Sequence, residues 1–133
     1  MLSQDCADSG PTNKQARWDN FLFLWPLLLA FSIHAFASAQ NEISHLLGFV
    51  ASTDCKYERN GTMHNGIEAV NHINIKYEYY LDEIKSAEDF IKYSATKSLM
   101  SGKYYKIYCE GLPVMRSENW LLDELMRYRG AQK

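Results

Sequence analysis

The sequence predicts an α+β domain in which about four helices pack against a small, mainly antiparallel sheet, in the order α-β-β-α-α-β-α. Three observations predict this fold class. Apolar residues recur at helical spacing in several segments, an Asn-Gly pair separates two short alternating runs, and one later segment alternates strictly. The chain has 133 residues, of which 47% are hydrophobic and 23% charged, which suits one globular domain.

The amino-terminal segment is predicted to be a signal peptide. Lys14 and Arg17 precede an uncharged apolar run, residues 21–36, which ends in an Ala-Ser-Ala sequence closing at Ala39. A positive flank, an apolar run and an A-x-A exit are typical of secretory signals, so we place cleavage after Ala39 and one exported domain at residues 40–133. The alternative is an uncleaved inner-membrane anchor, since the run approaches the length that spans a bilayer.

The first helix and a hairpin open the exported part. A helix is expected at about residues 41–52, where Ile43, Leu46, Leu47 and Val50 form one apolar stripe. Alternating residues on both sides of Asn60-Gly61 then predict a β-hairpin, because a type I′ turn needs positive φ at both central positions.

Two helices follow the hairpin. The first is expected to begin at Asn65, with Glu68 as its capping-box partner. Its predicted apolar stripe is Ile67, Val70, Ile73, Tyr77 and Leu81. A shorter helix is expected to begin at Ser86, with Asp89 in its first turn and Phe90 and Ile91 facing the core.

A strand and a last helix complete the order. Residues 103–109 alternate, so Tyr105, Ile107 and Cys109 share one face, and Tyr104, Lys106 and Tyr108 share the other. The final helix is expected from about residue 117 to 129, and its predicted buried residues are Trp120, Leu121, Leu125 and Tyr128.

Charge argues against nucleic acid as a partner. Residues 40–133 carry 12 basic and 13 acidic residues and have no basic stripe. Phosphate contacts supply most of the affinity in nucleic-acid binding, so a basic excess would be expected there. Contact with a membrane is expected only through the leader before it is cleaved.

Two cysteines remain after removal of the leader. Cys55 and Cys109 form an even pair in an exported domain of fewer than 100 residues, which favours a disulfide. The alternative is a free reactive thiol, which would need a cationic neighbourhood and a reducing partner.

Several short motifs, in order, resemble a known family. They are Cys55-Lys-Tyr-Glu-Arg-Asn-Gly61, Ala69-Val-Asn-His-Ile73 with Lys76, Ser86-Ala-Glu-Asp-Phe-Ile91, Ser101-Gly-Lys-Tyr-Tyr105 and Trp120-Leu121. Together they resemble the YfeK-like family of small exported bacterial proteins of unknown function. The resemblance implies a periplasmic protein of a Gram-negative bacterium and implies no activity.

Four groups of residues are candidates for a site. His64, Glu68 and His72 are spaced four apart, but they lack the tight geometry of metal ligands, so neither a metal nor another cofactor is expected. Arg59 with His72 and Lys76 could form a cationic pocket for a carboxylate or phosphate, or could belong to a solvated helix face.

The other two groups involve a serine and the tyrosines. Ser101 could act as a nucleophile with His72 as its base, or could serve only as a turn residue. Tyr104 and Tyr108, with Tyr79 and Tyr80, could meet a partner or could cover the core.

The leading hypothesis is therefore a non-enzymatic binding or interaction domain of the cell envelope, located in the periplasm. Its partner would be an envelope protein, a peptide or an anionic ligand. The alternatives are an envelope hydrolase, directed at peptidoglycan and using His72 with Glu68 or Ser101, and a structural stabiliser of an envelope complex. The predicted contact residues are Arg59, Asn60, His72, Lys76, Ser101, Tyr104 and Tyr108.

Overall fold

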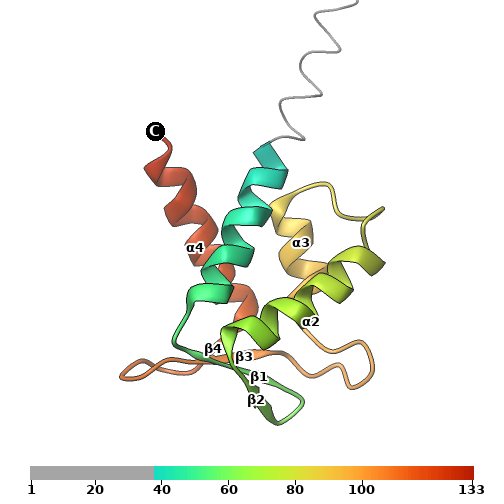
Figure 1. Cartoon of the computed structure of the whole chain (residues 1–133), viewed down its shortest axis with the longest axis vertical. Helices are drawn as coiled ribbons and strands as arrows, with labels where there is room; N and C mark the ends of the chain where they lie inside the picture. Colours follow the sequence, from blue (N-terminus) through green and yellow to red (C-terminus); the bar gives the residue numbers. More distant parts are fainter. Residues whose placement is uncertain (1–37) are drawn as a thin grey trace, which may run out of the picture. The chain divides into compact units, whose positions relative to one another are not determined.

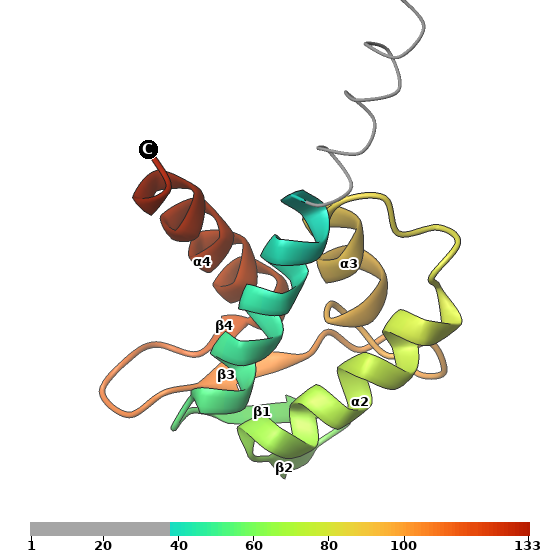
Figure 2. The same cartoon turned by 45° about the horizontal axis from the view of Figure 1, so that its top comes forward.

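The computed structural model describes residues 38–133, which form helices on one side of a four-stranded antiparallel sheet (Figures 1 and 2). The strand order is β2-β1-β3-β4. The strands are β1 (Lys56–Arg59), β2 (Thr62–His64), β3 (Lys106–Tyr108) and β4 (Met115–Arg116). The helices are residues 38–52, called the first described helix below, then α2 (Gly66–Tyr79), α3 (Ala87–Ser94) and α4 (Ser117–Ala131).

The predicted fold class and element order are confirmed, with one addition. Strand β4 was not predicted, because two residues are too few to show an alternating pattern. The predicted strand at residues 103–109 is shorter in the structure, where β3 covers Lys106–Tyr108 and Tyr104 makes an isolated bridge with Lys97.

The hairpin between β1 and β2 has the predicted turn. Asn60 and Gly61 adopt φ values of 52° and 81°, and Arg59 pairs with Thr62 across the turn. Positive φ at both central residues matches the right-handed twist of the two strands, as the Asn-Gly pair predicts.

Helix α2 begins as predicted but buries a different face. The Asn65 side chain accepts a hydrogen bond from the Glu68 amide at 2.9 Å, and the Glu68 carboxylate accepts from the Asn65 amide at 3.0 Å. The predicted apolar stripe is wrong at both ends, since Ile67 is 60% exposed and Leu81 is 54% exposed. Gly66 packs against the end of the first described helix, so the face of α2 that contains Gly66 is buried. Leu81 lies beyond the end of α2.

The core lies between the helices and the covered face of the sheet. Each helix contributes apolar residues to it, and Tyr57, Tyr105 and Ile107 contribute from the sheet side. The helical members are Ile43, Leu46, Val50, Ala69, Ile73, Ala87, Phe90, Ile91, Leu121 and Leu125. In α4 the prediction is confirmed for Leu121 and Leu125, whereas Trp120 and Tyr128 are half-buried.

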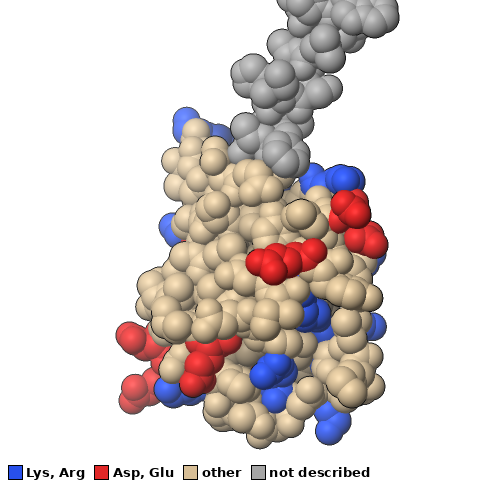
Figure 3. All heavy atoms as spheres, turned by 45° about the vertical axis from the view of Figure 1, so that its right-hand side comes forward, with Lys and Arg blue, Asp and Glu red and all other residues tan. Residues whose placement is uncertain are grey.

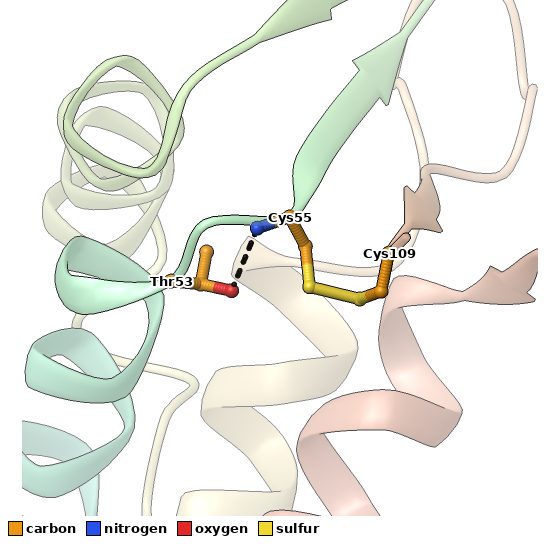
Figure 4. Close-up of a disulfide and its surroundings, with 3 residues drawn as sticks. All are labelled: Thr53, Cys55 and Cys109. Carbon is orange, nitrogen blue, oxygen red and sulfur yellow. Dashed lines mark hydrogen bonds between the residues drawn. A yellow bond between two sulfur atoms is a disulfide. The ribbon is translucent and has the colours of Figure 1, made fainter. Parts of the chain in front are cut away.

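A disulfide joins Cys55 and Cys109, as predicted (Figure 4). Lys56 pairs with Tyr108 in the β1–β3 ladder, so the two cysteines occupy the next opposed position. Their Cα atoms are 4.4 Å apart, which is the spacing of a narrow antiparallel pair. The disulfide therefore extends the ladder by one covalent link.

Most of the predicted leader lies outside the described residues. Only its last two residues, Ser38 and Ala39, are described, and they belong to the first described helix. Within residues 38–133, none of the helices is both long enough and apolar enough to cross a bilayer.

Candidate functional site

Arg59 and His72 meet on the helix-covered side of the sheet. Nη1 of Arg59 donates a hydrogen bond to Nδ1 of His72, and Nε2 of His72 lies 3.0 Å from the hydroxyl of Tyr105. A guanidinium can only donate, so Nδ1 accepts and Nε2 carries the proton that is donated to Tyr105. This chain of hydrogen bonds connects β1, α2 and the residue before β3.

Lys76 belongs to the same cluster. Its side chain is buried, its Nζ donates to the carbonyl oxygen of Lys97 at 2.7 Å, and it lies 5.2 Å from the centroid of the Tyr105 ring. Burial lowers the pKa of Lys76 to about 8. The ammonium group of Lys76 is therefore bound in the interior and has little contact with solvent.

The same surroundings keep His72 neutral. Burial, followed by the charges of Arg59, Lys76 and His64, lowers the pKa of His72 to about 4. Burial also raises the pKa of Tyr105. We therefore interpret Arg59, His72, Lys76 and Tyr105 as a network that fastens helix α2 to the sheet.

The residues predicted for a hydrolase are not assembled around His72. Both of its ring nitrogens are occupied by Arg59 and Tyr105. The Ser101 hydroxyl donates to Oδ1 of Asn60 at 2.6 Å, and Glu68 is engaged in the capping box. Among residues 38–133, no three His, Cys, Asp or Glu side chains are grouped so as to hold a metal ion.

Asn60 and Ser101 connect two turns. In addition to its contact with Ser101, Asn60 donates from Nδ2 to the hydroxyl of Ser98 at 3.3 Å. The Ser101 hydroxyl also accepts from the Lys103 amide at 3.3 Å. The hairpin turn and the loop before β3 are thereby held together at one end of the sheet.

Tyr104 and Tyr108 lie on the other face of the sheet. Tyr105 and Ile107 are buried under the helices, so alternation places Tyr104, Lys106 and Tyr108 on the opposite side. The structure thus separates the predicted contact residues, with Arg59, His72 and Lys76 on one face and the two tyrosines on the other. Tyr79 and Tyr80 are separate again, at the end of α2 beside Tyr93.

Cross-strand pairs bring further charges to this open face. Glu58 in β1 is opposite Lys106 in β3, and Lys106 is opposite Arg116 in β4. The Tyr108 hydroxyl donates to Oε2 of Glu58 at 2.5 Å, and this hydrogen bond raises the pKa of Tyr108. The carboxylate of Glu58 therefore has one oxygen engaged by a neighbouring hydroxyl.

A shallow pocket of about 380 Å³ opens on this face. It is lined by Glu58, Asn60, Gly61, Lys103, Tyr104, Lys106 and Arg116. The guanidinium of Arg116 lies 3.8 Å from the centroid of the Tyr104 ring, so the ring orients the basic group. With three basic side chains and one hydrogen-bonded carboxylate, the pocket is suited to an anion.

Only part of this pocket could be predicted from the sequence. Asn60 and Tyr104 were predicted as contact residues, and the alternating pattern had already placed Lys106 beside Tyr104. Lys103 directly follows the predicted Ser101-Gly102 turn, so its position beside the predicted contact residues could be read from the sequence. Glu58 and Arg116 carried no such signal, because the partners of β1 and the existence of β4 depend on the tertiary fold.

The fold is that of a small α+β domain with a basic pocket on its open sheet face. The chain belongs to a family of unknown function, DUF5329, whose model matches residues 37–129. No curated protein and no solved structure matches the chain significantly.

Proposed function

We propose that this chain is exported and works outside the cytoplasm as a non-enzymatic binding domain. Its ligand or partner would present a carboxylate or phosphate to the pocket on the open sheet face. The single observation that supports this most strongly is the grouping of Lys103, Lys106 and Arg116, none of which has a carboxylate within 4.0 Å among the described residues.

Two features of the chain support export. The leader combines a positive flank, an apolar run and the exit at Ala39, and the domain carries the Cys55–Cys109 disulfide, a bond typical of oxidising compartments. Cleavage after Ala39 would leave Gln40 as the first residue, and its side chain donates to the Tyr77 hydroxyl at 2.9 Å.

The finer placement follows from the resemblance described above. Similarity to the YfeK-like proteins favours the periplasm of a Gram-negative bacterium, with an uncleaved inner-membrane anchor as the alternative. Carboxylates of peptides and muropeptides and phosphates of lipid headgroups are all present in that compartment, and each matches the charge of the pocket.

Anion binding is tested by NMR titration of the folded protein with inorganic phosphate and, separately, with acetate. We expect amide shifts around Lys106 and Arg116, and a loss of affinity of at least tenfold in Lys106→Glu, because a charge-assisted hydrogen bond contributes about 1.5–3 kcal/mol. Lys85→Glu is the matched control, because Lys85 is an exposed lysine away from the pocket.

Unchanged affinity in Lys106→Glu, or an equal loss in Lys85→Glu, would contradict a specific anion site. The first result would show that the pocket is not used, and the second would show a response to net charge alone. Removal of the leader is checked independently, from the amino-terminal residue of the purified protein by mass spectrometry.

A further inference from the structure

We infer that the open sheet face docks on an anionic phospholipid bilayer, with apolar loop tips at its two ends entering the headgroup region. Docking depends on the anion site proposed above, because the same pocket would receive a lipid phosphate. Docking names an anionic phospholipid bilayer as the partner. It also adds a set of apolar contact residues that anion binding alone does not require.

The apolar loop tips are the first observation. In the loop before β3, Leu99 is 62% exposed and Met100 is 99% exposed. In the loop after β3, Leu112 is 67% exposed and Val114 is 50% exposed. Figures 1 and 2 both show these loops projecting from opposite ends of the sheet. Exposed apolar tips of this kind gain free energy when they leave water for a lipid interface.

The distribution of charge is the second observation. Residues 90–109 contain four lysines and no Asp or Glu, and Glu110 follows them in the loop after β3. Residues 78–89, from the end of α2 to the start of α3, contain five acidic residues and one lysine. Figure 1 shows the α2–α3 segment at the far end of the domain from the sheet. The face in Figure 3 has acidic groups at its upper right, centre and lower left, and basic groups over its lower part and also along its upper edge.

The open face itself carries a basic excess. Lys56, Lys106 and Arg116 project from its strands, opposed by Glu58, whose carboxylate accepts a hydrogen bond from Tyr108. Each basic residue near an anionic membrane surface strengthens binding by about fivefold. The negative charge of the bilayer therefore complements this face and repels the acidic segment on the far side.

The combination of groups favours a bilayer over a soluble anion. Apolar tips, tyrosines and basic residues are the three kinds of side chain that settle in the interfacial layer of a membrane, with rings at headgroup level. Tyr104 and Tyr108 lie between the two loops, next to the pocket. A soluble anion would occupy the pocket and leave Met100 and Leu112 without a contact.

Docking is tested in the full chain by placing a fluorescent reporter at a loop tip. Met100→Trp is compared with Ile75→Trp, because Ile75 is an exposed apolar residue too, at 67%, but lies on α2. The signal of the unsubstituted chain, with its three tryptophans, is subtracted. The remaining fluorescence comes from the introduced tryptophan, so it reports on the loop tip whether or not the leader inserts into the vesicle.

We expect vesicles of brominated phosphatidylglycerol to quench Met100→Trp and shift its emission to the blue. Vesicles of brominated phosphatidylcholine should have little effect, and Ile75→Trp should stay unquenched in both. Adding Lys106→Glu to Met100→Trp should weaken binding by about fivefold or more, and 0.5 M salt should weaken it further. Far-ultraviolet circular dichroism confirms that each variant is folded.

Quenching of Met100→Trp no stronger than that of Ile75→Trp would overturn docking. If phosphate still binds at Lys106 in that case, the anion site stands and its partner is a soluble molecule. Insertion of Met100→Trp without phosphate binding would contradict the anion site and, with it, the docking inferred here, because the bilayer would then be bound without the pocket.

Discussion

At the scale of single residues, the most informative group is His72. Arg59 donates to its Nδ1 and Tyr105 receives the proton of Nε2, so two neighbours select both its tautomer and its orientation. A protonated ring could not accept from Arg59 and would place a third positive charge beside Arg59 and Lys76. The network is therefore compatible only with the neutral ring.

His72 should titrate far below an ordinary histidine. Its pKa is lowered to about 4 from 6.5, so between these values the unfolded chain binds a proton that the folded chain does not. The free energy of unfolding should thus fall as pH drops from about 6.5 to 4 and should not depend on this group above pH 7. We expect a loss of about 1–2 kcal/mol, reduced by partial exposure of the ring.

The titration is measured directly from the imidazole NMR signals of His72. Urea unfolding at pH 7.5 and 4.5, compared with His72→Gln, isolates the contribution of this ring from those of the carboxylates. A midpoint near 6.5 would show that the ring is not held by Arg59.

At the scale of elements, the junction between the first described helix and α2 determines which face of α2 is buried. Gly66 is buried, and a Cβ atom there would collide with the carbonyl oxygen of Val50. The absence of a side chain allows the two helices to approach closely. This contact brings Ala69, Ile73 and Lys76 to the core, and it leaves Ile67 in solvent.

Gly66→Ala and Gly48→Ala should have opposite effects. Alanine is favoured over glycine in helices by about 1 kcal/mol, so Gly48→Ala, where nothing lies within 4 Å, should stabilise the protein by about 0.5–1 kcal/mol. Gly66→Ala should destabilise it by about 1–3 kcal/mol, because a backbone carbonyl must move. Chemical unfolding of both variants measures the difference, and equal effects would mean that the junction is loose.

At the scale of the whole molecule, links between distant segments hold the layers together. Arg129 in α4 binds Glu42 of the first described helix at 2.7 Å and Glu88 of α3 at 2.5 Å. The disulfide joins β1 to the end of β3 over a sequence separation of 54 residues. The ion pairs are partly exposed and contribute little individually, so the disulfide is the stronger constraint.

Reduction of the disulfide should destabilise the domain substantially. Closing a loop of this length restricts the unfolded chain by about 4 kcal/mol in the chain-entropy model, which is an upper value if the native state is strained. Urea unfolding with and without reductant, with intact mass confirming the thiol state, measures the loss. If the free energies of unfolding of the oxidised and reduced protein differ by less than about 1 kcal/mol, the hydrogen bonds between β1 and β3 hold these strands together without the disulfide.

Local chemistry made most of the fold predictable from the sequence. The Asn60-Gly61 turn, the Asn65 and Glu68 cap and the alternation around Tyr105 depend on neighbouring residues, and the structure confirms each of them. The disulfide was predictable from the two cysteines of residues 40–133, on the expectation that this part of the chain is exported.

Only the tertiary structure decided the composition of the site. It placed Arg59, His72 and Lys76 in an interior network, and it paired Glu58, Lys106 and Arg116 across three strands. Strand neighbours and helix rotation depend on contacts between segments far apart in the chain, such as Gly66 against Val50. A periodic pattern reports which residues share a face, but it does not report what that face meets.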